Sequence, residues 1–149
     1  MTRATPRLRS IARRLMAHEA SRHESSRTGD PLFPVLERLR PALATLMGKL
    51  GYRGFLARAL AAAGEEVRWL RAVHVKSDGS LMGLQELQAQ LAPALFFEGR
   101  TVMLAQLLGS LVAFIGGELT LQLVSDTWPK LSLKDLDFGK GDEIEKTRS

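Results

Sequence analysis

The chain has 149 residues, of which 45% are hydrophobic, and a formal net charge of +5. This length and composition suffice for one compact domain and exclude a globally disordered protein. Cysteine is absent, which excludes disulfides, thiolate metal ligands and a cysteine nucleophile.

Charge is spread unevenly along the chain. Residues 1–76 hold 15 Lys and Arg against 6 Asp and Glu, whereas residues 77–149 hold 6 against 10. This asymmetry indicates either an anionic partner or complementary surfaces within or between subunits.

The first residues lack the apolar region of a secretory signal. With the absence of cysteine, this favours a cytoplasmic protein.

The first predicted helix runs from about Pro6 to Arg22, with Pro6 suited to the first turn. Its apolar side chains share one face. The stretch 23–30 behind it has linker composition. We therefore expect this helix to project from the bundle or to dock on a neighbouring subunit, through Leu8, Ile11, Leu15 and Met16.

The same helix is rich in arginine, which gives it two alternative roles. It could contact the phosphates of a nucleic acid, or lie on an anionic membrane surface. The candidate anion-binding residues are Arg3, Arg7, Arg9, Arg13 and Arg14.

Two further helices are predicted at about 34–50 and 52–72. The first carries leucines spaced alternately by four and three from Leu32 to Leu50, a pattern typical of a helix–helix seam. Pro41 predicts a kink within it, and Gly48 and Gly51 indicate its end. The second has an apolar face that begins at Tyr52.

The chain changes character at residues 73–81, where brief alternation and an Asp-Gly pair predict a β-hairpin-like insertion. A short helix is expected at about 84–91. A last helix is expected at about 98–128 and to end at Pro129, with Trp128 and Leu123 mostly buried. The pair Gly116–Gly117 favours a kink or break within it.

The run 101–117 carries no charge. Within it, small residues recur every fourth position, which on a helix places them in one stripe that allows a partner helix to approach closely. The run also reaches the lower length limit of a membrane-spanning helix, although Glu118 follows it directly. The candidate partner contacts of this stripe are Ala105, Gly109, Ala113 and Gly117.

These elements predict an all-α fold: a helical bundle of four main helices plus one short helix, with the hairpin-like insertion near 73–81. Three regions are expected. They are a basic amphipathic helix and linker (1–30), the bundle domain (31–133) and a flexible polar tail (134–149).

No catalytic constellation stands out. His18 and His23 are five residues apart, which places them on different faces of a helix and does not fit a zinc motif. His18–Glu19 is loosely similar to the phospho-accepting histidines of bacterial signalling, and that match rests on two residues. We expect no enzyme activity, no cofactor, no metal site and no small-molecule substrate.

The favoured hypothesis is a non-catalytic intracellular interaction or regulatory module that acts as a homo-oligomer or adaptor through helix–helix contacts. Its partner would be a second copy or another helical protein. The alternatives are a nucleic-acid-binding protein that uses the arginine-rich helix and a membrane-associated protein that uses residues 101–117.

Overall fold

The computed structural model describes residues 6–22 and 33–131. Within these ranges the chain forms five α-helices, one 3-10 helix and a two-stranded antiparallel sheet. The all-α fold class predicted from the sequence is confirmed. The expected boundaries at residues 30 and 133 lie outside the described residues.

Helix α1 (Pro6–Arg22) has the predicted bounds. Helix α2 (Pro34–Glu66) also starts on a proline and keeps helical geometry through Pro41. The chain leaves helical geometry at Gly48, where φ is 80° and ψ is 165°. A left-handed φ favours glycine, and this residue therefore turns α2 into two successive helical halves.

The leucine seam of the first half of α2 is buried only in part. Leu36, Leu39 and Leu43 are buried, whereas Leu46 and Leu50 are exposed. The predicted helix over 52–72 is shorter than expected, because the second half of α2 ends at Glu66 and the 3-10 helix η1 (Arg68–Ala72) follows.

The insertion is a hairpin, as predicted. Strand β1 (His74–Val75) pairs with β2 (Leu81–Met82) in the register His74 to Met82 and Val75 to Leu81. At the tip of the hairpin, Gly79 has a φ of 87° and packs against the ring of Tyr52. Helix α3 (Leu84–Gln90) then forms the expected short helix.

The last predicted helix is two helices. Helix α4 (Pro93–Ile115) begins at Pro93 rather than near Glu98, because proline suits a first helical turn. Gly116, with a φ of 92° and a ψ of 161°, separates α4 from α5 (Gly117–Thr127). Trp128 is buried and Leu123 is half-buried.

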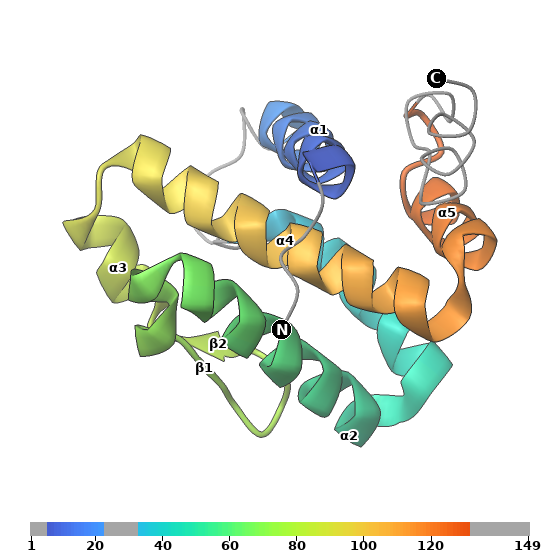
Figure 1. Ribbon diagram of the computed structural model, residues 1–149, viewed down its shortest axis with the longest axis horizontal. Helices are drawn as coiled ribbons and strands as arrows, with labels where there is room; N and C mark the ends of the chain where they lie inside the picture. The colour runs from blue at the N-terminus through green and yellow to red at the C-terminus, as the bar shows by residue number, and fades with distance from the viewer. Residues whose placement is uncertain (1–5, 23–32, 132–149) are drawn as a thin grey trace.

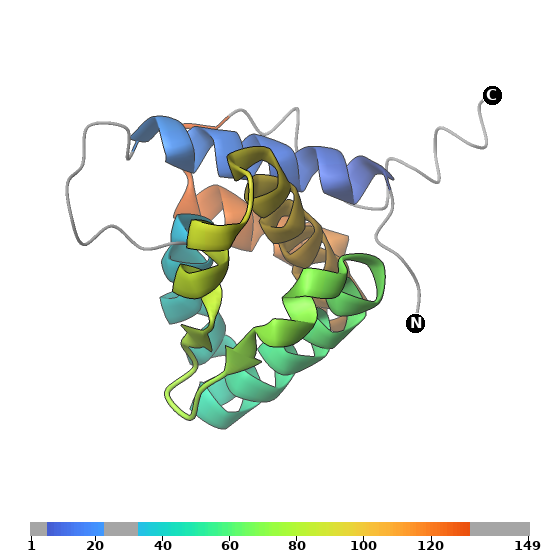
Figure 2. The same cartoon turned by 90° about the vertical axis from the view of Figure 1, so that its left-hand side faces the viewer.

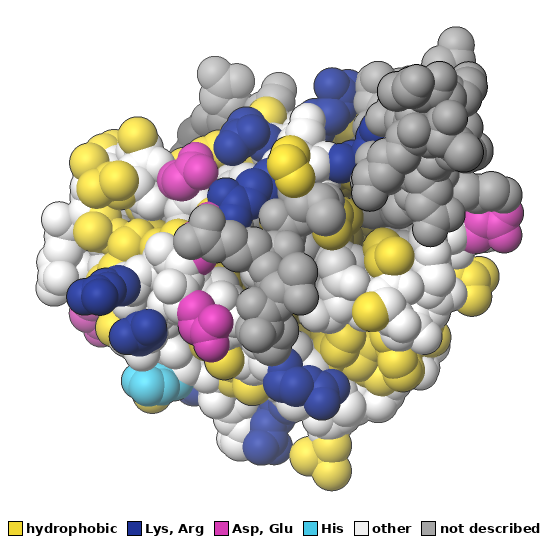
Figure 3. Space-filling model, in the orientation of Figure 1, with side chains coloured by type: hydrophobic (Ala, Val, Ile, Leu, Met, Phe, Trp, Pro, Cys, Tyr) yellow, Lys and Arg dark blue, Asp and Glu magenta, His cyan; other side chains and the backbone are white. Residues whose placement is uncertain are grey.

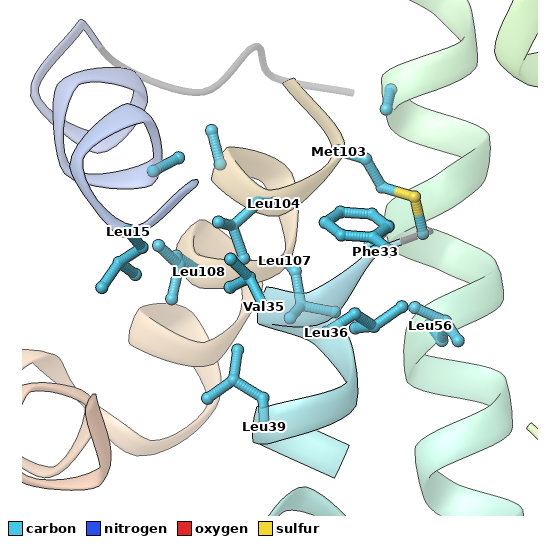
Figure 4. Packing of buried hydrophobic residues seen from close by; sticks show 14 of the residues in the cluster. Leu15, Phe33, Val35, Leu36, Leu39, Leu56, Met103, Leu104, Leu107 and Leu108 are labelled. Atoms are coloured by element: carbon cyan, nitrogen blue, oxygen red, sulfur yellow. The ribbon is translucent and has the colours of Figure 1, made fainter. Parts of the chain in front are cut away.

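Helix α4 is the central element of the bundle. It lies between α1 on one side and the two halves of α2 on the other, as the two perpendicular views show (Figures 1 and 2). Residues 101–108 of α4 are all buried. Figure 4 shows Leu15 of α1 beside Leu108 of α4, with Phe33 and Leu36 from the start of α2 in the same cluster.

The position of α1 corrects one expectation. We predicted that this helix projects from the bundle or docks on a neighbouring subunit, but Ile11, Leu15 and Met16 are at most 4% exposed and Leu8 packs against the core of the same chain. The apolar face of α1 covers α4 of its own chain. Because α4 is apolar almost all round, burial of both surfaces within one chain is favourable.

Candidate interaction surface

The two helix breaks lie at the same end of the bundle and leave apolar side chains exposed there. Gly48 and Gly116 are the turning points (Figure 1). Four large hydrophobic side chains beside them are exposed by 45% to 77%. We call this region the corner surface and define it by the exposed residues Leu46, Leu50, Phe114 and Leu119 together with Met47 and Ile115.

A first groove of about 570 Å³ lies between the second half of α2 and the end of α4. Its walls include Phe55 and Phe114, whose ring centroids are 6.4 Å apart. Figure 3 shows hydrophobic side chains gathered at the lower right of this face, with Lys and Arg side chains beside them. The first groove is therefore an apolar cleft with Arg58 in its lining.

A second groove of about 650 Å³ lies on the other side of the corner, between the first half of α2 and α5. Its lining includes Pro41, Leu46, Leu119 and Asp126. Leu46 and Met47 line different grooves, as do Phe114 and Ile115, so consecutive residues of each helix form the ridge between them. Two apolar grooves that meet at exposed leucine and phenylalanine side chains are typical of a surface that binds helices.

The predicted small-residue stripe is divided among three environments. Ala105 is fully buried, and a Cβ atom placed on Gly109 would lie 3.2 Å from Cδ1 of Leu8. The atom that this Cβ would contact belongs to a side chain of α1 and not to its backbone. Ala113 is exposed in the first groove, and Gly117 is half-buried at the start of α5. Half of the stripe serves the core, and Ala113 lines the first groove.

The arginines of α1 make ion pairs within the chain. Arg9 pairs with Glu66 at the end of α2, and Nη2 of Arg13 lies 3.8 Å from Oε2 of Glu98 on α4. Arg7 and Arg14 also make contacts with other residues, and Arg3 lies outside the described residues. Pairing with acidic neighbours reduces the positive charge that Arg9 and Arg13 could offer to phosphates.

A buried polar network escaped the sequence analysis. The carboxylate of Glu19 is fully buried; its Oε2 accepts a hydrogen bond from Nε1 of Trp128 at 2.6 Å and lies 2.7 Å from Nε of Arg38. These contacts join α1, α2 and the end of α5. Ile11, Leu15 and Glu19 are spaced by four residues, which places Glu19 on the apolar face of the helix. This spacing is the feature of the sequence that could have predicted the burial of Glu19.

The described part of the chain gives less support to a metal site, a histidine site or a membrane-spanning helix. No three His, Asp or Glu side chains are close enough there to hold a metal ion. His18 is half-buried and His74 is exposed. Helix α4 is long and apolar enough to cross a membrane, but 61% of its most apolar stretch is buried inside the chain. A core helix passes the same test.

Comparison with known protein families, curated proteins and solved structures finds no match to this chain. The candidate site therefore rests on the geometry of the corner surface.

Proposed function

We propose that this chain is a non-catalytic helical interaction module that acts as a homo-oligomer through the corner surface. The supporting observation is that the exposed side chains of Leu46, Phe114 and Leu119 line two adjoining apolar grooves. Monomeric proteins rarely leave large contiguous apolar patches exposed, since covering such a patch is favourable.

The shape of this surface favours a protein partner over a lipid surface. A concave groove offers most of its apolar area to a side chain or helix that enters it, whereas a bilayer surface contacts projecting groups. Phe114 projects beside the first groove, and Leu50 projects from α2 two residues after Gly48. A surface with both projections and grooves can be complementary to a second copy of itself.

The test is the native mass of the full chain in detergent-free buffer, measured by light scattering or sedimentation over a range of concentrations. Leu119 and Leu95 form a matched pair, because they are 57% and 56% exposed and only Leu119 belongs to the corner surface. We expect a concentration-dependent mass above that of the monomer. Leu119→Ser should weaken association by about tenfold, and Leu95→Ser should leave it unchanged.

A wild-type chain that stays monomeric at every concentration would overturn this function. Equal effects of Leu119→Ser and Leu95→Ser would show that the corner surface is not where copies meet. Circular dichroism of each variant establishes that the fold is retained.

A further inference from the structure

The first groove has a cation in its lining that makes no ion pair with any described residue. Lys49, Arg53 and Arg58 lie on the second half of α2, and Arg58 lines the groove. None of the three has an ion-pair partner among the described residues. Arg58 therefore presents an exposed cation beside an apolar cleft.

Helix α5 has the complementary pattern on its outer face. Thr120 and Val124 are buried against the bundle, whereas Glu118, Leu119 and Asp126 are exposed. In the described part of the chain neither acid has an ion-pair partner. The outer face of α5 thus offers an exposed leucine together with two exposed carboxylates.

The positions of the charges around their helices select the pair that can meet. Lys49 and Arg53 lie nine and five residues before Arg58, which at about 100° per helical residue places them on other sides of α2. Arg58 is therefore the cation that faces the groove. On α5, Leu119 and Asp126 are seven residues apart and share one face, and both line the second groove. A helix that turns this face toward the first groove can insert its leucine and bring its carboxylate to Arg58.

We infer that the first groove of one copy receives the outer face of α5 from a second copy, so that Leu119 enters the groove and Asp126 faces Arg58. This inference rests on the proposed self-association and names its contact. In a two-fold pair the same contact forms twice, since each copy contributes one groove and one α5. The chain's own α5 is not the occupant, because its outer face borders the second groove.

The test is a charge swap on the full-length protein, with Arg58→Glu and Asp126→Arg as the two variants. Either variant alone places like charges opposite each other at both contacts of a two-fold pair. We expect each to raise the dissociation constant by about tenfold or more.

An equimolar mixture of the two forms a mixed pair in which one contact is wild-type and the other has both charges reversed. Opposite charges then face each other at both contacts, and the mixture should associate like the wild type. A double variant with both changes in one chain should do the same.

Arg68→Glu serves as the control, because Arg68 is an exposed arginine of η1 outside both grooves. It should leave association unchanged. Association of the wild type should also weaken with added salt, since exposed charges are screened.

The outcomes separate this inference from the function on which it rests. Loss of association in Leu119→Ser, with no effect of either charge reversal, would overturn the α5 contact and leave self-association standing. Failure of the mixture to associate when both single variants are monomeric would also overturn it. Masses that grow beyond a dimer would exclude the two-fold arrangement. A monomer that binds anionic vesicles through Lys49 and Arg53 would overturn both proposals.

Discussion

At the scale of single residues, the buried polar groups show how the helices are held in place. Glu19 lies on the apolar face of α1 and is tolerated there because Arg38 and the indole N–H of Trp128 meet its carboxylate. A buried carboxylate without such partners would strongly disfavour folding. The three residues come from distant parts of the sequence, so their pairing fixes the ends of α1 and α5 relative to α2.

Tyr52 is the contrasting case, because its hydroxyl is buried without a hydrogen-bond partner. Its ring lies against Gly79 and near the guanidinium of Arg40, whose Cζ is 6.0 Å from the ring centroid. Burial raises the pKa of Tyr52 to about 12 from 10.0, against the opposing effect of Arg40. The unfolded chain therefore loses this proton at a lower pH than the folded one.

Below pH 10, Tyr52 is protonated in both the folded and the unfolded chain, and its ionisation does not change the free energy of unfolding. Between pH 10 and about 12, only the unfolded chain releases this proton, and the free energy of unfolding therefore falls. Tyr52→Phe should remove this loss, so that the variant is relatively more stable than the wild type at alkaline pH by up to about 2 kcal/mol. At neutral pH the variant should match or exceed the wild type, since it removes an unsatisfied hydroxyl. Urea unfolding at several pH values measures the difference.

The chain has a single tyrosine, and the ultraviolet absorbance of tyrosinate therefore reports on Tyr52 alone. Ionisation of the folded protein near pH 10 would contradict the burial of this hydroxyl. Parallel alkaline loss of stability in both proteins would assign the effect to other groups.

At the scale of elements, glycines decide where helices end and how closely they pack. Gly48 and Gly116 have left-handed φ values, and a Cβ atom placed on either would meet no atom within 4 Å. Backbone conformation, not crowding, therefore requires glycine at these two positions. Gly99 and Gly109 lie within helix α4, where the absence of a side chain allows neighbouring side chains to pack closely. Trp69 covers Gly99, and Leu8 covers Gly109.

Gly109→Leu should overpack the contact between α4 and α1. We expect it to lower the free energy of unfolding by about 1–3 kcal/mol, because the new side chain would displace Leu8 from a packed position. Ala113→Leu is the matched control from the same stripe, since Ala113 is exposed in the first groove and has room for a larger side chain.

Chemical denaturation of the two variants distinguishes the packed half of the stripe from the open half. A Gly109→Leu protein as stable as the wild type would show that α1 does not rest on α4 at this position. A large loss of stability in Ala113→Leu would mean that the first groove is closed in solution.

At the scale of the whole molecule, α1 belongs to the core. Removal of residues 1–27 would expose the face of α4 that α1 covers, along with the carboxylate partners Arg38 and Trp128. We expect the chain from residue 28 to lose cooperative unfolding and to expose apolar surface, because burial of this face supplies much of the driving force for folding. Calorimetry and dye binding measure both effects. A sharp thermal transition in the shortened chain would restore the prediction of a projecting helix.

Much of the fold could be predicted from local patterns. The bounds of α1, the hairpin at 74–82, the short helix α3 and the separation of helices near Gly48 and Gly116 follow from proline, glycine and apolar spacing. These features act over a few residues and are therefore visible in the sequence. The burial of Trp128 was also expected, from its place at the end of an apolar helix.

The sequence by itself determined which segments are helical, where they turn and that the run 101–117 is apolar. It did not determine which apolar face covers which. Leu15 and Leu50 each continue an apolar helical face, yet Leu15 is fully buried and Leu50 is 77% exposed. The tertiary structure decided this, because a bundle has more apolar faces than one core can cover. Packing of α1 on α4 satisfies one face and leaves the corner surface exposed.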